Sequence, residues 1–189
     1  MAFEDYKQKD SVVIVYTGAS KGKTSASLGL MVRALGNDWR VAYVQFIKEW
    51  EVSEHAFIRR ILPLFEGKLS FYKGGKGFYR AGDLSAEAVS DAEHLAAATA
   101  TYQHALTLAT SGNFDLVICD EINNAVNDEL LTTQQLRELI QQRAPQTSLC
   151  LTGRNFPETL LDEVDIATEM RKIKHHFDNK FLAKKGIDY

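Results

Sequence analysis

The sequence predicts an α/β fold in which a mainly parallel sheet is flanked by helices. Short apolar runs of strand length alternate along the chain with longer segments of helical periodicity, the order expected of βαβ units. The run at residues 12–16 is rich in β-branched residues, which is typical of a strand buried on both faces. A glycine- and lysine-rich turn follows it at once and leads into a helical segment.

Six apolar runs are expected to form the strands: residues 12–16, 41–47, 69–72, 116–119, 149–152 and 166–170. The first helix is expected after the turn, because four apolar residues between positions 28 and 35 recur at i, i+3, i+4 and i+7. Further helices are expected at residues 54–65, 85–109 and 132–143, with a helical turn at 160–163. Pro63 should end or kink its helix, and Thr132 and Gln135 have the spacing of a capping box.

Length and composition describe one globular domain, residues 1–189. The net charge of −3 is distributed over both signs, so nucleic acid is not expected as the main partner. No run approaches the ~18 apolar residues of a membrane span, and residues 1–10 lack the apolar stretch of a signal peptide. Because Cys119 and Cys150 lie inside apolar runs, we expect reduced thiols and a cytoplasmic protein.

The most informative segment is residues 17–25, Thr-Gly-Ala-Ser-Lys-Gly-Lys-Thr-Ser, between the first expected strand and the first helix. This is the position of a phosphate-binding P-loop, in which glycines let successive backbone N–H groups point at one anion. Lys23 would add a cation to the phosphates, and the Thr24 hydroxyl would bind Mg²⁺. The expected fold is therefore P-loop NTPase-like (RecA-like). The expected ATP-binding residues are Gly18, Ala19, Ser20, Lys21, Gly22, Lys23, Thr24 and Ser25.

The spacing of this loop departs from the usual one. Four residues normally separate the first glycine from the Gly-Lys pair, whereas Gly18 and Gly22 enclose three, and Thr17 stands where that glycine is expected. A glycine- and lysine-rich surface turn is the alternative interpretation. The coincidence of strand, helix and Gly-Lys-Thr triplet favours the P-loop.

Two acidic residues, Asp120 and Glu121, close the apolar run at 116–119. A P-loop protein places its Mg²⁺-directed carboxylate at the end of such a strand, although an acid there can also merely cap the next helix. Adjacent residues on a strand point to opposite sides. The pair alone therefore does not identify the ligand.

Several segments, in order along the chain, resemble the ATP:corrinoid adenosyltransferases. The loop at residues 18–25 resembles the family's Gly-Asn-Gly-Lys-Gly-Lys-Thr-Thr loop, which has the same three-residue gap. The other matching segments are Val-Gln-Phe-Ile-Lys at 44–48, Asp-Glu-Ile-Asn at 120–123, Leu-Thr-Gly-Arg at 151–154 with Pro157, Thr-Glu-Met at 168–170, Lys-His-His-Phe at 174–177 and Gly-Ile-Asp-Tyr at 186–189. The resemblance extends from about residue 12 to the last residue.

The resemblance implies an enzyme that transfers the 5′-deoxyadenosyl group of ATP to the cobalt of a reduced Co(I) corrinoid, forming adenosylcobalamin or a precursor. Triphosphate would leave, so the loop would stabilise a leaving group rather than transfer a phosphoryl group. The implied catalytic residues are Lys23, Thr24, Glu121 and Phe78, with Thr24 and Glu121 holding Mg²⁺ (or Mn²⁺). The implied substrates are ATP and cob(I)alamin or a cobinamide-type corrinoid, and the implied partners are an electron-donating reductase and a second copy in a homodimer.

The glycine-rich loop at residues 73–83 is expected to be a flexible loop that faces the corrinoid through Phe78, Tyr79 and Arg80. Arg80 stands where the family has a tryptophan, which helps to displace the lower cobalt ligand. Two alternatives therefore stay open: a P-loop ATPase or kinase, which would release ADP or AMP, and a non-catalytic corrinoid- or nucleotide-binding protein. His175 and His176 are not expected to share a metal, because adjacent side chains of an extended segment point opposite ways.

Overall fold

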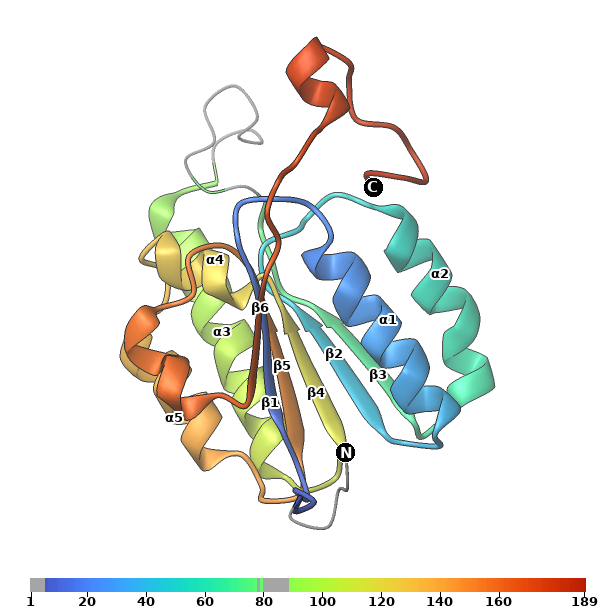
Figure 1. Ribbon diagram of the computed structural model, residues 1–189, viewed down its shortest axis with the longest axis vertical. Coiled ribbons are helices and arrows are strands. Elements are labelled where there is room, and N and C mark those ends of the chain that lie inside the picture. Colours follow the sequence, from blue (N-terminus) through green and yellow to red (C-terminus); the bar gives the residue numbers. More distant parts are fainter. Residues whose placement is uncertain (1–5, 78, 80–88) are drawn as a thin grey trace.

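The computed structural model describes residues 6–77, 79 and 89–189, and it confirms the predicted α/β fold (Figure 1). Within these residues, six strands form one parallel sheet in the order β3-β2-β4-β5-β1-β6. The strands are β1 (Val13–Thr17), β2 (Val41–Gln45), β3 (Leu69–Lys73), β4 (Leu116–Asp120), β5 (Ser148–Thr152) and β6 (Ile166–Glu169). Each corresponds to a run predicted as a strand, and β2 ends two residues earlier than predicted.

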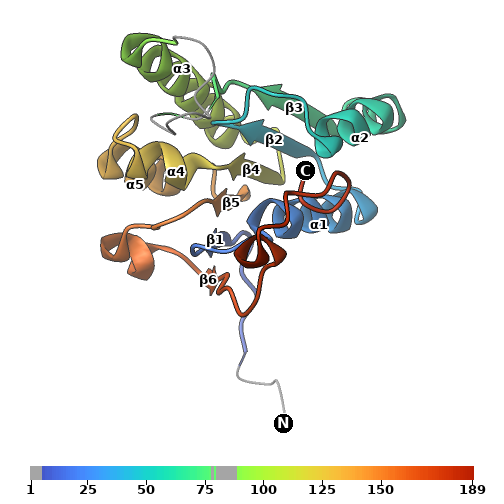
Figure 2. The same cartoon turned by 90° about the horizontal axis from the view of Figure 1, so that it is seen from above.

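Helices cover both faces of the sheet, with α1 and α2 on one face and α3, α4 and α5 on the other (Figure 2). The helices are α1 (Lys23–Gly36), α2 (Ser53–Ile61), α3 (Asp91–Thr110), α4 (Ile122–Asn127) and α5 (Thr133–Gln142), and short 3₁₀ segments lie at Leu62–Phe65, Glu158–Glu163 and His176–Asn179. Successive strand residues face opposite sides, which creates two apolar cores. On β2, Ala42 and Val44 pack with α3, whereas Val41 and Tyr43 pack with α1.

Helix boundaries follow local chemistry that the periodicity did not resolve. α3 begins at Asp91, not at residue 85, because Ser90 is extended (φ −70°, ψ 155°) and forms a capping box with Glu93; residues 85–88 lie outside the described part of the chain. Pro63 acts as predicted, since α2 stops at Ile61 and continues as a 3₁₀ segment. The helix α4 was not predicted, because six residues are too few to show a helical period.

The parallel arrangement brings the carboxyl ends of β1, β2 and β4 to one edge of the sheet (Figure 1). In open α/β sheets, ligands bind outside this edge. The loop at residues 18–22 and the acidic pair at the end of β4 both lie there. Separately, none of the helices in the described residues has the length and hydropathy needed to cross a bilayer.

Candidate functional site

The loop at residues 18–22 joins β1 to α1 in the arrangement that a P-loop requires. Gly18 (φ 102°) and Gly22 (φ 110°) adopt backbone conformations that favour glycine. A Cβ atom at Gly18 would lie only 2.6 Å from the carbonyl oxygen of Met170. The same carbonyl accepts a hydrogen bond from the Ser20 N–H (3.1 Å). The loop is therefore braced against the segment after β6, and the N-terminus of α1 opens directly from it.

The Lys23 side chain lies over this loop. Its ammonium donates to the carbonyl oxygens of Gly18 (2.7 Å) and Ser20 (2.6 Å). Burial lowers the pKa of Lys23, and the neighbouring Arg154 lowers it further, while Glu121 acts in the opposite direction. Lys23 and Arg154 both line the cavity beside the loop, and a polyphosphate bound there would interact favourably with both cations.

Both acids of the predicted pair reach the site, although adjacent strand residues normally diverge. Asp120 ends β4, and the backbone of Glu121 lies in the left-handed region (φ 65°, ψ 17°), which residues other than glycine rarely adopt. The Lys48 Nζ atom lies 3.8 Å from Asp120 Oδ2 and 3.9 Å from Glu121 Oε1. The strained backbone therefore lets two successive carboxylates face one cation.

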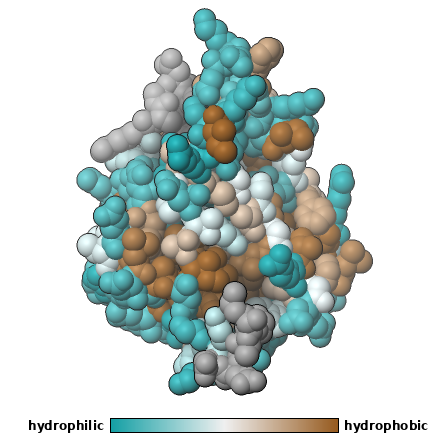
Figure 3. All heavy atoms as spheres, viewed as in Figure 1, coloured by the Kyte–Doolittle hydropathy of each residue, from teal (hydrophilic) through white to brown (hydrophobic). Residues whose placement is uncertain are grey.

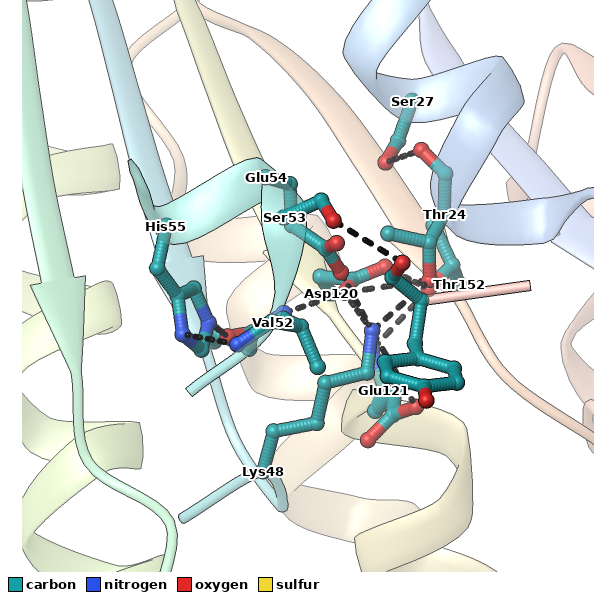
Figure 4. A network of polar contacts seen from close by, with 12 residues as sticks. Thr24, Ser27, Lys48, Val52, Ser53, Glu54, His55, Asp120, Glu121 and Thr152 are labelled. Atoms are coloured by element: carbon teal, nitrogen blue, oxygen red, sulfur yellow. Dashed lines mark hydrogen bonds and ion pairs between the residues drawn. The ribbon is translucent and has the colours of Figure 1, made fainter. Parts of the chain in front are cut away.

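Lys48 lies at the centre of the polar network shown in Figure 4. Besides the acidic pair, its ammonium donates to Glu54 Oε1 (2.9 Å) and to Thr24 Oγ1 (3.4 Å). Burial alone would lower the pKa of Lys48, but Asp120, Glu121 and Glu54 together raise it above its ordinary value. Lys48 is therefore a charged lysine that lies within 3.9 Å of three carboxyl groups.

The donor set around Lys48 also fits a divalent cation. The Glu121 Oε2 atom is buried without a hydrogen-bond partner, and burial next to Asp120 raises the pKa of Glu121 to about 7. The Lys48 ammonium, which contacts the Thr24 hydroxyl and both acids, marks a position where positive charge is stabilised. Within the described residues, no three His, Cys, Asp or Glu side chains form a metal cage, and Mg²⁺ is usually held by one or two carboxylates together with substrate phosphates.

A cavity of about 1040 Å³ adjoins the loop and the acids. Its polar lining includes the loop residues 19–25, the cations Lys48 and Arg154, and the acids Glu54, Glu121, Asp128 and Asp188. Its aromatic lining comes from Trp50, Phe57, Tyr79 and Tyr189. A lining of this kind suits a ligand with an anionic part and a flat apolar part.

Of the three residues expected to face the corrinoid, Phe78 and Arg80 lie outside the described residues. Tyr79 is half-buried, lines the cavity and packs edge-on against the His94 ring, with centroids 5.2 Å apart. The beginning of this segment packs closely against neighbouring parts of the chain. A Cβ atom at Gly75 would lie 2.2 Å from the carbonyl carbon of Ile47, just after β2, and the Gly74 N–H donates to the carbonyl oxygen of Gln45 (3.0 Å), the last residue of β2.

The C-terminal segment contacts the P-loop through Asp188. This carboxylate accepts the Lys184 N–H (2.7 Å) and pairs with Lys21 (2.9 Å), and these contacts hold its pKa at about 2. His175 and His176 both face Asp188, at 3.9 and 3.5 Å, and their ring centroids are 4.6 Å apart. The expectation that these two side chains point opposite ways is therefore wrong, because the segment curls around one carboxylate.

Several residues of the site had no role assigned from sequence. Lys48 and Arg154 follow β2 and β5 as Glu121 follows β4, and this position at a strand end was the available signal. His55 and Gln45 are fully buried and join the network below Asp120. No sequence pattern pairs them, because only the folded chain brings α2 over the end of β2.

Comparison with known proteins identifies one family. Residues 9–189 match the model of the family described as ATP:corrinoid adenosyltransferase BtuR/CobO/CobP. The corrinoid adenosyltransferase of Pseudomonas aeruginosa is 31% identical over 184 residues, which cover 97% of this chain and 86% of that protein. That of Escherichia coli is 31% identical over 179 residues, covering 94% and 85%. The corrinoid adenosyltransferase CobA of Salmonella typhimurium is 30% identical over 184 residues, covering 97% and 88%.

Proposed function

Because the chain belongs to the ATP:corrinoid adenosyltransferase family BtuR/CobO/CobP and is a corrinoid adenosyltransferase, we propose that its P-loop holds the triphosphate of ATP as the leaving group. The observation that carries this proposal is the strand-to-helix loop with Lys23 folded over it, which lines the same cavity as Arg154. Reduced cobalt attacks C5′ of ATP and forms the Co–C bond. The C5′–O bond breaks, and its electron pair leaves with the triphosphate.

In this proposal the protein stabilises the negative charge that develops on the triphosphate. The N–H groups of the loop and of the first turn of α1 face the phosphates, and Lys23 moves its hydrogen bonds from the loop carbonyls to phosphate oxygens. Arg154 neutralises charge from the β5 side. The aromatic lining receives the apolar parts of the two substrates.

We further propose that Thr24 and Glu121 hold Mg²⁺ (or Mn²⁺) beside the phosphates. The support is the orphaned Glu121 Oε2 atom together with the position of the Lys48 ammonium. The cation supplies charge neutralisation to the leaving group when bound. Glu54 already pairs with Lys48 at 2.9 Å. This ion pair can persist when the metal replaces the contacts of Lys48 with the other acids.

The phosphate product tests this function against its alternatives. Incubation with ATP and chemically reduced cobalamin should give adenosylcobalamin and intact triphosphate in equal amounts. ADP or AMP as the product would instead identify a P-loop ATPase or kinase. Binding of both ligands without turnover would identify a non-catalytic carrier.

The Arg80 substitution predicts a spectroscopic difference from tryptophan-bearing relatives. Removal of the lower ligand makes Co(I) more accessible, and an apolar wall under the ring favours that removal, whereas a hydrated guanidinium does not. In cob(II)alamin bound with Mg-ATP, we expect the four-coordinate species to form incompletely, to increase in Arg80→Trp and to disappear in Phe78→Ala. Absorption and electron paramagnetic resonance spectra measure this species. Arg80→Lys, the charge-matched control, should not increase it, and complete conversion that survives Phe78→Ala would contradict the prediction.

The exposed edge of the sheet supports a homodimer. All four residues of β6 are exposed, among them the apolar Ile166, and Leu161 shortly before the strand is exposed as well. Figure 3 shows apolar residues gathered on the face of the molecule in view. An uncovered edge strand offers backbone groups that another chain can pair with. We expect a dimer in sedimentation experiments, shifted toward monomer by Ile166→Lys. A monomer at all concentrations would contradict this.

We also infer a reductase partner and a cytoplasmic location. The transfer starts from Co(I), so an electron donor must act on the corrinoid first. Cys119 and Cys150 are buried, unpaired thiols, which fit a reducing compartment. An assay started from cob(II)alamin should therefore give product only with a reductant present, and product formed without any electron source would refute the requirement.

A further inference from the structure

A chain of hydrogen bonds connects the start of α2 to the P-loop through two polar residues, Gln45 and His55, whose side chains are completely buried. Figure 4 shows His55 next to Val52, on the far side of the network from Thr24. Burying a polar side chain costs free energy unless its groups are hydrogen-bonded. The partners of these two residues therefore indicate their role.

The backbone assigns the proton of His55. The Val52 N–H, which can only donate, points at His55 Nδ1 (3.3 Å), so Nδ1 accepts and the proton lies on Nε2. Burial lowers the pKa of His55, and Lys73 lowers it further, so the neutral ring is favoured. The Nε2–H group then donates to Gln45 Oε1.

This bond fixes the amide of Gln45. With Oε1 held by His55, the NH₂ group faces the acid and donates to Asp120 Oδ2 (3.0 Å). The reversed amide would place its oxygen against the carboxylate and its NH₂ against the ring N–H, and both contacts would be repulsive. The His55 N–H and the Asp120 carboxylate therefore hold the Gln45 amide from both ends in one orientation.

Asp120 passes this orientation to the P-loop. Its Oδ1 atom accepts the Thr152 hydroxyl (2.7 Å), and its Oδ2 atom accepts the Thr24 hydroxyl (3.3 Å). A Thr24 proton directed at Asp120 leaves the oxygen lone pairs free for a cation. The Lys48 ammonium already occupies that side of Thr24, at 3.4 Å.

We propose that His55 is a positioning residue of the transferase: through Gln45 it holds Asp120 in the direction that presents the Thr24 oxygen to the metal and phosphates. The inference rests on the proposed function, in which Thr24 holds Mg²⁺. The same chain of bonds fixes the first turn of α2, which carries Glu54, the partner of Lys48.

Calorimetric titration of the full chain with ATP, in Mg²⁺ and separately in EDTA, tests the proposal. His55→Leu should weaken ATP binding about tenfold in Mg²⁺ and by no more than about twofold in EDTA. The reason is that the chain of hydrogen bonds from His55 positions Thr24, the proposed metal ligand. His55→Gln, whose amide N–H can reach Gln45, should stay within about threefold of the unmodified protein. His55→Asn is too short to reach and should behave like His55→Leu.

A double-mutant cycle shows whether the effect passes through Gln45. In a Gln45→Leu background, His55→Leu should add no more than about twofold to the loss of affinity. Ile58→Val, at another buried position of α2, is the packing control and should leave ATP affinity unchanged. If His55→Leu fails to fold, the comparison of His55→Gln with His55→Asn decides alone.

The proposal is overturned if His55→Leu keeps its Mg-ATP affinity or loses affinity equally in Mg²⁺ and in EDTA. It is also overturned if His55→Gln binds Mg-ATP no better than His55→Asn, or if the losses of affinity caused by Gln45→Leu and His55→Leu are fully additive. Failure of the underlying function gives a different result. In that case the unmodified protein would bind ATP equally well with and without Mg²⁺.

Discussion

Replacing Lys23 by alanine is expected to weaken Mg-ATP binding by about 1.5–3 kcal/mol, roughly ten- to a hundredfold. The Lys23 ammonium lies over the loop, where two backbone carbonyls hold it at 2.6 and 2.7 Å. Substrate phosphates offer charged acceptors in place of these neutral ones, and charge-assisted hydrogen bonds are stronger. Isothermal calorimetry of the variant with Mg-ATP measures the loss.

Lys21→Ala is the matched control, because it removes a positive charge from the same loop. The Lys21 side chain is 52% exposed and pairs with Asp188, so its removal should cost less ATP affinity than removal of Lys23. Equal losses in both variants would show that only net charge matters. Unchanged affinity in Lys23→Ala would show that the phosphates bind elsewhere.

Replacing Glu121 by glutamine should lower Mg²⁺-dependent turnover by at least about tenfold while the fold survives. The amide keeps the shape of the side chain but removes the charge that the orphaned Oε2 atom offers to a cation. Burial and Asp120 raise the pKa of Glu121 to about 7, so the folded protein already disfavours the ionised carboxylate. In the absence of metal, the unfolding midpoint of the variant at pH 8 should therefore be no lower than that of the unmodified protein.

Turnover as a function of Mg²⁺ concentration, together with thermal unfolding, measures both effects. Glu158→Gln, an exposed carboxylate on the 3₁₀ segment Glu158–Glu163, is the control for loss of one negative charge. Undiminished turnover with unchanged Mg²⁺ dependence in Glu121→Gln would mean that the ligand lies elsewhere, and Asp120 would be the next candidate.

The phosphate loop and the strands could be predicted from local sequence patterns, whereas the order of the strands in the sheet could not. The loop after β1 was predictable because a P-loop is contiguous in sequence and needs glycine at its left-handed positions, here Gly18 and Gly22. The strands were predictable because parallel strands are continuously apolar. Their order was not, since it depends on which helix covers which face.

The surroundings of the proposed metal site were less predictable, because they come from separate elements. Lys48 follows β2, Glu54 lies in the first turn of α2, and Glu121 follows β4, so no spacing rule links them. The prediction that adjacent acids diverge assumed regular strand geometry. The left-handed backbone at Glu121 breaks that geometry, and nothing in a single sequence marks a strained residue of this kind.

The bond that breaks in ATP tests most directly the claim that triphosphate is the leaving group. ATP labelled with ¹⁸O at the bridging oxygen between C5′ and the α-phosphorus can be incubated with the enzyme and chemically reduced cobalamin, and the products can be examined by phosphorus NMR and mass spectrometry. We expect all of the label in intact triphosphate and none in adenosylcobalamin, because attack at C5′ breaks the carbon–oxygen bond. Label retained in ADP or AMP, with phosphate or diphosphate released, would show phosphorus–oxygen cleavage and contradict the proposed role of the P-loop.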